Sequence, residues 1–347
     1  MTARLASPLA ELDAVDRSVQ LLPDAAAAVV ATAVRAPSLH NTQPWRFRVC
    51  GDVLELRADR TRQLTATDPD GRELVISCGA ALLGARLALQ HLGRAPAVHR
   101  MPRRGDPDLL AELWAGRPAS QDPDVEQLVR AMGRRRSYRG RFDGPPVEPS
   151  LVFRLQQAAE LEGARLVLVQ RPGARRAVAD LVAAAERSQQ SDAAVRAELE
   201  QWTPPPGSGR RDGVPATAYP VRPAPTCAQE LPRRDFAAGR EQGFATPAAG
   251  LDAGAPVPVM AALVTVGDGP ADWLLAGSAL YRVLLTAATA DVVVSLHGQA
   301  TELAGLRRLL ADELLVDEHP QLLLQLGRST TTTPPTPRRP VADVLDR

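Results

Sequence analysis

The sequence contains no lysine, and all 41 of its Lys and Arg residues are arginine. A P-loop lysine, a Schiff-base lysine for pyridoxal phosphate and a lysine general base are therefore excluded. A bound phosphate has to be held by arginine side chains, backbone amides or hydroxyl groups. This absence narrows the possible enzyme classes before any motif is considered.

The sequence also has few cysteines, few aromatic residues and a net charge close to zero. Cys50, Cys78 and Cys227 are widely spaced and odd in number, which predicts neither a disulfide framework nor a zinc knuckle. The five histidines show no HExxH spacing, so no metal site is expected. A net charge of +1 and an aromatic content of 3% give no argument for a nucleic-acid partner.

Long apolar runs are expected to be absent as well. No run approaches the roughly 20 residues needed to cross a bilayer. The N-terminal stretch MTARLASPLAELDAVDRS carries too many charges for a signal peptide. We therefore expect no membrane partner and a cytoplasmic location.

Hydrophobic periodicity predicts helices and strands in two stretches of the chain. The first stretch contains a helix N-capped by Asp24, a β-hairpin at 46–58, a buried helix at 73–93 and a strand at 106–116. The second contains helices at 149–163, 271–290 and 301–313, two further helices before Trp202, and strands at 164–170, 257–267 and 320–328. Within the second stretch, between Trp202 and the strand at 257–267, residues 203–256 are rich in proline and glycine and show no clear periodicity. Such a segment is typical of a lid or a linker.

The two stretches contain an internal repeat. Residues 78–93 align without gaps on residues 276–291, at an offset of 198. Each copy follows one strand pattern and precedes another, which favours a duplication. A chance similarity of two alanine-rich helices is the alternative.

Three short motifs carry most of the polar chemistry. The loop RAPSLHNTQPW (35–45) concentrates hydrogen-bonding side chains between two prolines, although such residues can also satisfy their own turn. The cluster RRRSYRGRF (134–142) suits a phosphate dianion through guanidinium groups, a hydroxyl and helix amides. A solvated basic turn is the alternative for that cluster. The third motif is the tail PTPRRPVADVL (335–345).

Together these motifs resemble those of the flavin-dependent nitroreductase superfamily. The match consists of the APSxxNxQPW loop (Ala36, Pro37, Ser38, Asn41, Gln43, Pro44, Trp45), the RRSxRxF-like motif (Arg135, Arg136, Ser137, Arg139, Phe142) and the tail (Gly327, Pro337, Arg338, Arg339, Pro340). In ordinary members the arginine motif precedes the loop within a short subunit. Here the loop comes first in a chain of nearly double length, which resembles the Acg-like branch.

The Acg-like resemblance implies an α+β fold made of two nitroreductase-like halves in one chain, a fused pseudo-dimer. Each half is expected to contain a mixed or antiparallel sheet flanked by helices. The halves are placed at residues 1–125 and 126–347, with residues 203–256 as a lid over the flavin pocket.

The resemblance also implies FMN as the cofactor, with no catalytic side chain because flavin N5 carries the hydride. The implied FMN-binding residues are Pro37, Ser38, Leu39, Asn41, Gln43, Arg135, Arg136, Ser137, Arg139, Ser295, His297, Gly298, Arg338 and Arg339, with Gln299 as a weaker candidate. For His297, a satisfied loop histidine is the alternative.

The two halves differ in what they retain. Residues 15–22 keep the Arg17–Ser18 pair but lack the arginine cluster, and no loop motif precedes residue 165. We therefore expect one complete site, one FMN per chain and a monomer that contains its own pseudo-dimer interface.

Two functions fit the resemblance. The first is an oxidoreductase that passes a hydride from NAD(P)H through FMN to a small acceptor, either a nitro compound or a quinone. The second is an FMN-sequestering or stress-associated binding protein with little turnover. A domain without a cofactor would require all three motif matches to be coincidental.

Overall fold

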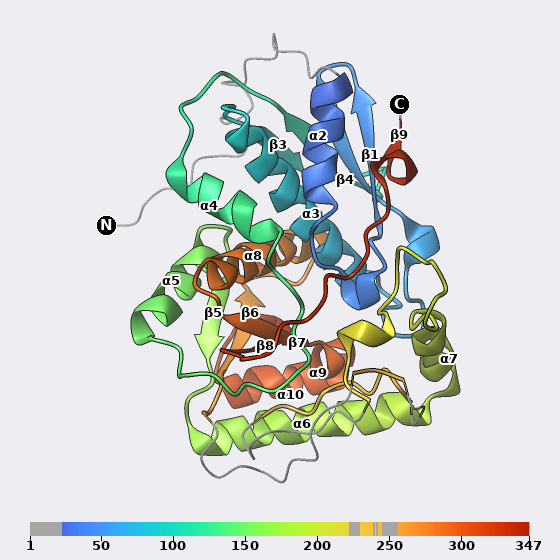
Figure 1. Cartoon of the computed structure of the whole chain (residues 1–347), viewed down its shortest axis with the longest axis vertical. Helices are drawn as coiled ribbons and strands as arrows, with labels where there is room; N and C mark the ends of the chain where they lie inside the picture. The colour runs from blue at the N-terminus through green and yellow to red at the C-terminus, as the bar shows by residue number, and fades with distance from the viewer. Residues whose placement is uncertain (1–22, 222–229, 239, 241, 245–255, 347) are drawn as a thin grey trace.

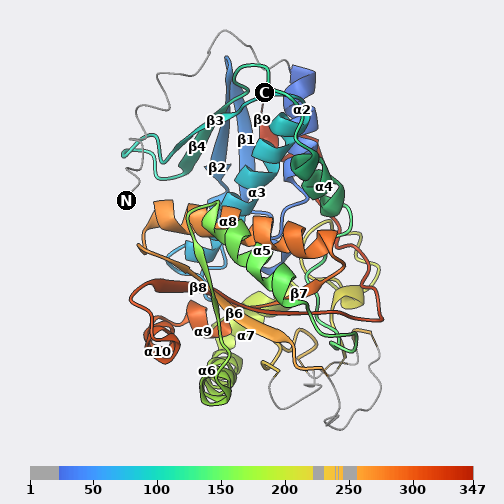
Figure 2. The ribbon, with the colours of Figure 1, turned by 90° about the vertical axis from the view of Figure 1, so that its left-hand side faces the viewer.

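The structure, a computed structural model, describes residues 23–221, 230–238, 240, 242–244 and 256–346 (Figure 1). Two β-sheets are separated by two long helices, α3 (Arg72–His91) and α8 (Pro270–Thr289), as Figure 2 shows. The predicted α+β fold with two sheet-and-helix halves is therefore confirmed. The boundary placed between residues 125 and 126 stays a prediction, and it falls within helix α4 (Pro123–Met132).

The first half contains a five-stranded sheet. The predicted hairpin is confirmed as β1 (Trp45–Cys50) and β2 (Val53–Ala58), which meet at Gly51 with a φ of 63° that glycine adopts without steric cost. The strand order is β3 (Ala97–Arg100), β4 (Leu109–Trp114), β2, β1 and β9 (Leu345–Asp346). Because β9 pairs in parallel with β1, the end of the chain completes the sheet of the first half.

Helix α2 (Pro23–Ala33) differs in one detail from the expectation. Asp24 was expected as the N-cap but lies inside the helix, which begins at Pro23. Proline suits a first helical turn because its fixed φ matches the helix and the backbone N–H it lacks would have no partner there. The helix ends at Ala33, shortly before Pro37, which disfavours helical geometry at the residue preceding it.

The second half contains a four-stranded antiparallel sheet. Its strand order is β5 (Arg165–Leu168), β6 (Val259–Thr265), β8 (His319–Gly327) and β7 (Val293–His297). Ala261 and Leu263 of β6 belong to the central core, whereas Met260 and Ala262 pack in a separate cluster. Helices α5 (Pro149–Glu160) and α8 lie on the central side, and α6 (Pro172–Ser191) and α10 (Ala304–Leu314) cover the outer side (Figure 2). Burial of both faces explains why β6 is an uninterrupted apolar run.

Helices α3 and α8 cross where two glycines meet. A Cβ atom on Gly79 would lie 2.1 Å from the carbonyl oxygen of Leu274, and one on Gly277 would lie 1.9 Å from that of Ile76. Gly277 and Leu274 follow Gly79 and Ile76 by 198 positions, the offset of the repeat. The two contacts are therefore equivalent under an internal two-fold relation, as at the interface of a symmetric dimer. This geometry supports the duplication read from the sequence.

Helix α3 also corrects the expectation that no apolar run approaches membrane-spanning length. Among the described residues, it is long and apolar enough to cross a membrane by length and composition. However, 83% of its apolar window is buried inside the protein. This burial is typical of the core helix of a folded domain.

Candidate functional site

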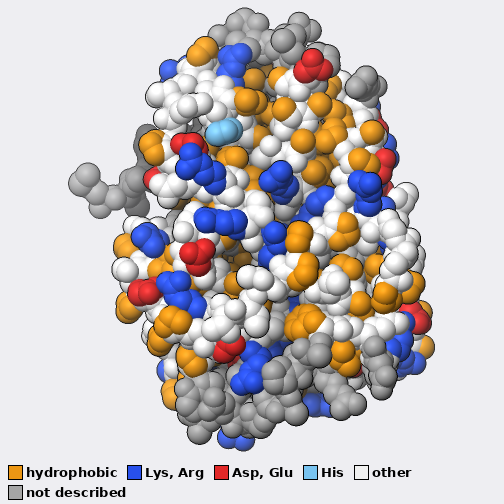
Figure 3. Space-filling view, viewed as in Figure 1, with side chains coloured by type: hydrophobic (Ala, Val, Ile, Leu, Met, Phe, Trp, Pro, Cys, Tyr) orange, Lys and Arg blue, Asp and Glu red, His pale blue; other side chains and the backbone are white. Residues whose placement is uncertain are grey.

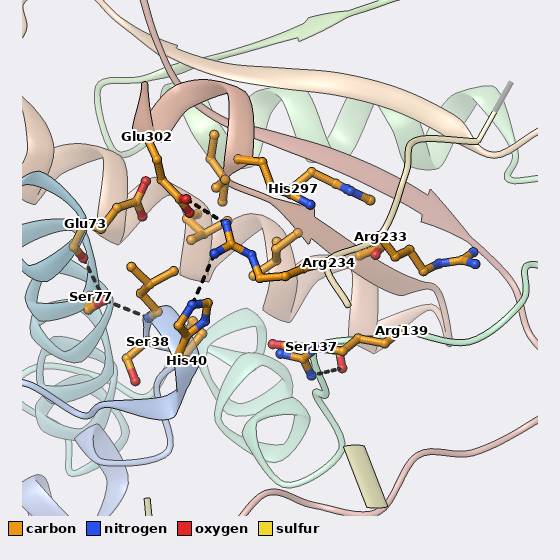
Figure 4. A pocket seen from close by; sticks show the side chains of 18 of the residues that line it. Ser38, His40, Glu73, Ser77, Ser137, Arg139, Arg233, Arg234, His297 and Glu302 are labelled. Carbon is orange, nitrogen blue, oxygen red and sulfur yellow. Dashed lines mark hydrogen bonds and ion pairs between the residues drawn. The ribbon is translucent and has the colours of Figure 1, made fainter. Parts of the chain in front are cut away.

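A pocket of about 100 Å³ lies between the two halves (Figure 4). The first half supplies the loop at 37–40 and the start of α3, and the second half supplies residues 137–139, the end of β7 and α9 (Gln299–Glu302). Residues of the 203–256 segment close it, namely Pro220, Arg233, Arg234 and Phe236. The pocket is therefore composite, with walls from both halves and the segment predicted as a lid.

The loop at 35–45 has an unusual backbone. His40, Asn41 and Gln43 adopt φ angles of 47°, 56° and 52°, in the left-handed region that few non-glycine residues occupy. The Ser38 hydroxyl accepts a hydrogen bond from the Gln43 amide at 2.9 Å, which closes the turn. The Leu39 amide donates to the Ser77 hydroxyl of α3 at 3.1 Å. Several strained residues held by specific contacts are typical of a functional loop.

Asn41 and Gln43 connect this loop to the C-terminal tail. The Asn41 amide donates to the carbonyl oxygens of Gly213 at 3.0 Å and Pro337 at 3.1 Å. The Gln43 side chain donates to the Arg211 carbonyl at 2.9 Å and accepts from the Arg339 amide at 2.8 Å. Both side chains therefore join the loop to the tail and to residues 211–213, outside the wall of the pocket.

Three arginines near the pocket have no carboxylate partner among the described residues. Arg135 is 5% exposed, and its Nε and one terminal nitrogen have no hydrogen-bond partner there. Arg139 donates hydrogen bonds to two backbone carbonyl oxygens. Arg338 donates to the side-chain oxygen of Asn41 at 3.0 Å and to nearby neutral oxygens, while its Nε has no partner.

Burial lowers the pKa of all three guanidinium groups. Burial and the positive charge of Arg135 together lower the pKa of Arg338 to about 9 and that of Arg139 to about 10. The hydroxyl of Tyr281 is buried without a partner beside Arg135 and Arg338. Concentrated positive charge with unused donors provides a binding site for an anion with several acceptor oxygens, such as a phosphate.

Arg136 and Arg339 have different surroundings from these three. Arg136 is half-buried and donates to the carbonyl oxygens of Gly133 and Arg135, at 2.9 and 2.8 Å. Arg339 lies along the tail, where it donates to the Asp343 carbonyl at 2.8 Å. Basic side chains spread across the middle of this face, where the tail passes from the second half to the first (Figures 1 and 3).

The end of β7 contributes a buried histidine to the pocket wall. The Nδ1 atom of His297 lies 3.1 Å from the carbonyl oxygen of Pro232, so Nδ1 carries the proton. Its Nε2 atom is buried without a partner among the described residues and is left as an acceptor. Burial and the nearby charge of Arg233 lower the pKa of His297 to about 3. The imidazole is therefore neutral at physiological pH, beside Ser295 and Gly298 in the same wall.

The described part of residues 203–256 is attached to the pocket by a buried ion pair. Arg234 lies 2.6 Å from the carboxylate of Glu302, and both side chains are less than 10% exposed. Arg234 also lies 3.4 Å from Nε2 of His40 (Figure 4). Phe236 packs edge-on against His40 and stacks on Tyr219, and the Arg139 guanidinium lies 4.9 Å from its ring centre. These contacts hold the segment across the pocket.

A second acidic side chain enters the pocket from the start of α3. Glu73 is 4% exposed and forms an ion pair with Arg72, which also donates to Gln321. Burial, against the opposing charge of Arg72 and with the nearby carboxylates of Glu302 and Asp68, raises the pKa of Glu73 to about 7. The Glu73 carboxyl therefore exchanges its proton close to neutral pH.

The structure separates the sequence-predicted site residues into three groups. One group lines the pocket and contains Pro37, Ser38, Leu39, Ser137, Arg139, Ser295, His297, Gly298 and Gln299. A second, Arg135 and Arg338, forms the buried cationic cluster beside it. A third supports the site through backbone contacts and contains Asn41, Gln43, Arg136 and Arg339. Cys227 and the Arg17–Ser18 pair lie outside the described residues.

Sequence reasoning missed several residues of the pocket wall that carry polar groups, namely His40, Glu73, Ser77, Tyr138, Arg233, Arg234 and Glu302. The internal repeat could have revealed two of them. At the offset of 198, Glu73 corresponds to Ala271 and Ser77 corresponds to Leu275. Polar residues in one copy and apolar residues in the other mark a position where the two halves have different roles.

Comparison with known proteins gives close relatives over almost the whole chain. Rv3131 of Mycobacterium tuberculosis, named as an NAD(P)H nitroreductase, is 36% identical over 322 residues, covering 92% of this chain and 90% of the relative. The protein acg of the same organism, also named as an NAD(P)H nitroreductase, is 30% identical over 337 residues. The match covers 93% of this chain and 95% of acg. No family model matches the chain.

Solved structures similar to this chain include two nitroreductases. The FMN- and NADPH-dependent nitroreductase NfnB from Sphigopyxis sp. strain HMH is 21% identical, with a TM-score of 0.39, and the match covers 63% of this chain and 98% of NfnB. A nitroreductase with bound FMN from Desulfitobacterium hafniense DCB-2 is 13% identical, with a TM-score of 0.39. The match covers 64% of this chain and 97% of that nitroreductase.

Proposed function

Because the chain belongs to the nitroreductase superfamily, in the branch that includes acg, we propose that it binds one FMN and passes electrons from NAD(P)H to a small acceptor. The acceptor is a nitro compound or a quinone. The observation that carries the proposal is the group of buried arginines, beside a composite pocket, that have no counter-anion among the described residues.

The phosphate of FMN suits the cationic cluster. Arg135 and Arg338 would hold it through charge-assisted hydrogen bonds, and the free hydroxyl of Tyr281 offers a further donor. Each bond to a charged group contributes about 1.5–3 kcal/mol. A phosphate therefore offsets the cost of burying these cations, which nothing among the described residues does.

The pocket supplies contacts for the ring of FMN. When bound, FMN supplies two-electron transfer through its ring, and the protein orients it and excludes water. The neutral Nε2 of His297 is an unused acceptor suited to a ring N–H group. Arg139 places a positive charge in the same wall, and the loop at 37–39 forms the opposite one. These residues would fix the ring between the two halves.

The segment across the pocket has to move for a flavin to enter. The present volume of about 100 Å³ lies below the roughly 300–1,000 Å³ of ligand pockets. Arg234 lies between the two walls (Figure 4), and Phe236 of the same segment also lines the pocket. We infer that residues 203–256 act as a lid that opens to admit FMN and the nicotinamide, as lids in other enzymes do.

Flavin binding by an arginine variant tests the proposal. Arg135→Met removes the buried guanidinium, and we expect FMN affinity to fall about 10-fold or more, the effect of losing one charge-assisted hydrogen bond. Fluorescence titration of apoprotein with FMN measures this change. Arg134→Met is the matched control, because Arg134 is exposed and adjacent in sequence.

Turnover tests the second part of the proposal. The wild-type protein with FMN should consume NADPH in the presence of a quinone or a nitroaromatic compound. FMN binding with no NADPH consumption would instead support the sequestering role. Equal FMN affinity in Arg135→Met and wild type would contradict the phosphate assignment.

A further inference from the structure

We propose that Glu73 is the proton donor to the acceptor oxygen, an inference that rests on the proposed function. Reduction of a quinone requires two electrons and two protons. A side chain in the pocket wall is placed to supply the second proton directly, and Glu73 is an acidic group in that wall.

The position of Glu73 suits this role. It occupies the second residue of α3, so the helix fixes its backbone at the boundary of the two halves. Figure 4 shows the carboxyl groups of Glu73 and Glu302 directed toward each other in the pocket. These residues are 4% and less than 2% exposed. Each carboxyl group has an arginine partner, but two carboxylates in one buried site also repel each other, which favours a proton on one of them.

The surrounding charges determine which carboxyl retains it. Glu302 forms a direct ion pair with Arg234 at 2.6 Å and accepts a hydrogen bond from the Gln189 amide at 2.6 Å. Arg72 pairs with Glu73 but also donates to Gln321 and to the Thr301 carbonyl, so its N–H donors are divided among several acceptors. The charged and titratable groups that act on Glu73 are Arg72, Asp68, Glu302 and Arg234. Burial outweighs the arginines, so Glu73 is the member of the pair that takes up and releases a proton near pH 7.

The duplication provides an independent argument. Glu73 corresponds to Ala271 in the second copy of the helix, although the crossing glycines Gly79 and Gly277 are retained. The acidic residue of the second copy, Asp272, is one position further along and accepts a hydrogen bond from the Gly269 amide at 3.0 Å. Of these two acidic residues, Glu73 is the one in the pocket wall, at the end of the crossing that belongs to the complete site.

The proton of Glu73 completes the reduction of the quinone. A quinone that receives two electrons and one proton carries a negative charge on its second carbonyl oxygen. The O–H bond of Glu73 breaks, its electron pair stays on the carboxylate, and a new O–H bond forms on the quinone oxygen to give a hydroquinone. Glu73 then takes a proton from water when the pocket opens. The electrons come from NAD(P)H through the bound flavin.

The experiment separates the two half-reactions. Protein loaded with FMN is reduced with dithionite, and its reoxidation by benzoquinone is followed by stopped-flow absorbance. We expect Glu73→Gln to slow reoxidation about 100-fold or more, the usual contribution of a general acid. The wild-type rate should fall as the pH rises through about 7, because the acid form is lost, whereas the slow rate of the variant should stay flat.

Glu55→Gln is the matched control, since Glu55 is 2% exposed in the first sheet and lies outside the pocket wall. It should reoxidise like wild type. Infrared difference spectra of the flavin-free protein give a second measurement. A protonated carboxyl band should titrate near pH 7 in wild type and be missing from Glu73→Gln.

Two results would overturn the proposal. One is a Glu73→Gln variant that binds FMN and reoxidises at the wild-type rate. The other is a wild-type spectrum and reoxidation rate without a titration near pH 7, a readout that holds even if the variant does not fold. Failure of NADPH to reduce the wild-type flavin would instead count against the proposed function alone, because dithionite replaces NADPH in this experiment.

Discussion

Arg135 is a cation that the fold buries without a counter-anion among the described residues. Such a placement costs free energy in the apoprotein, because desolvation of the guanidinium is not offset. Arg135→Met should therefore stabilise the apoprotein by about 1 kcal/mol or more while weakening FMN binding. Chemical denaturation of flavin-free protein measures the first effect. A variant less stable than wild type would indicate that Arg135 stabilises the fold itself.

The buried His297 should make the stability of the fold depend on pH. The folded protein holds its pKa at about 3, whereas an unfolded chain has an ordinary value near 6.5. Between these values the unfolded state binds a proton that the folded state excludes, so stability is lost as the pH falls below about 6.5. His297→Gln should reduce this loss, measured as the difference in melting temperature between variant and wild type across that range. A difference independent of pH would contradict the buried neutral imidazole.

At the scale of elements, the crossing of α3 and α8 determines how the halves fit together. Gly277→Ala would place a Cβ atom 1.9 Å from a backbone carbonyl of α3, and we expect a loss of about 1–3 kcal/mol or more in unfolding free energy. Gly305→Ala in α10 meets no atom within 4 Å and is the control. Since alanine is the better helix former, that control should be neutral or stabilising by up to about 1 kcal/mol. Urea denaturation of both variants checks the contrast.

A buried ion pair contributes to the attachment of the proposed lid, together with the ring contacts of Phe236. Arg234→Met leaves the Glu302 carboxylate without its partner, so residues 203–256 should leave the pocket more often. Limited proteolysis should cut this segment faster in the variant than in wild type. Arg210→Met is the control, because Arg210 lies in the same segment but pairs with Asp212 at a half-exposed position. Equal cleavage of wild type and Arg234→Met would show that other contacts hold the lid.

Sequence reasoning identifies elements better than long-range contacts. The hairpin at Gly51 and the buried helices follow from local periodicity, and the structure contains both. That Asn41 and Gln43 face the tail could not be predicted, because their partners Pro337 and Arg339 lie nearly 300 residues away. Glu73 belongs to no motif and stands out in the sequence only by its mismatch with Ala271 in the repeat, so its place in the pocket had to come from the packing of α3 against the second half.

At the scale of the whole molecule, the fused halves predict a single flavin site. The complete site takes its loop from the first half and its arginines from the second, whereas the equivalent positions of the repeat carry Ala271 and Leu275 instead of Glu73 and Ser77. A second phosphate would lack the guanidinium groups at Arg135 and Arg338. Loss of two charge-assisted bonds weakens binding about 100-fold or more.

The ratio of flavin to protein in a molecule of known size tests this account most directly. Protein saturated with FMN and passed through a sizing column is assayed for flavin absorbance, protein concentration and molar mass by light scattering. We expect one FMN per chain on a monomer. Two flavins per chain, or flavin carried only by a dimer of chains, would contradict it.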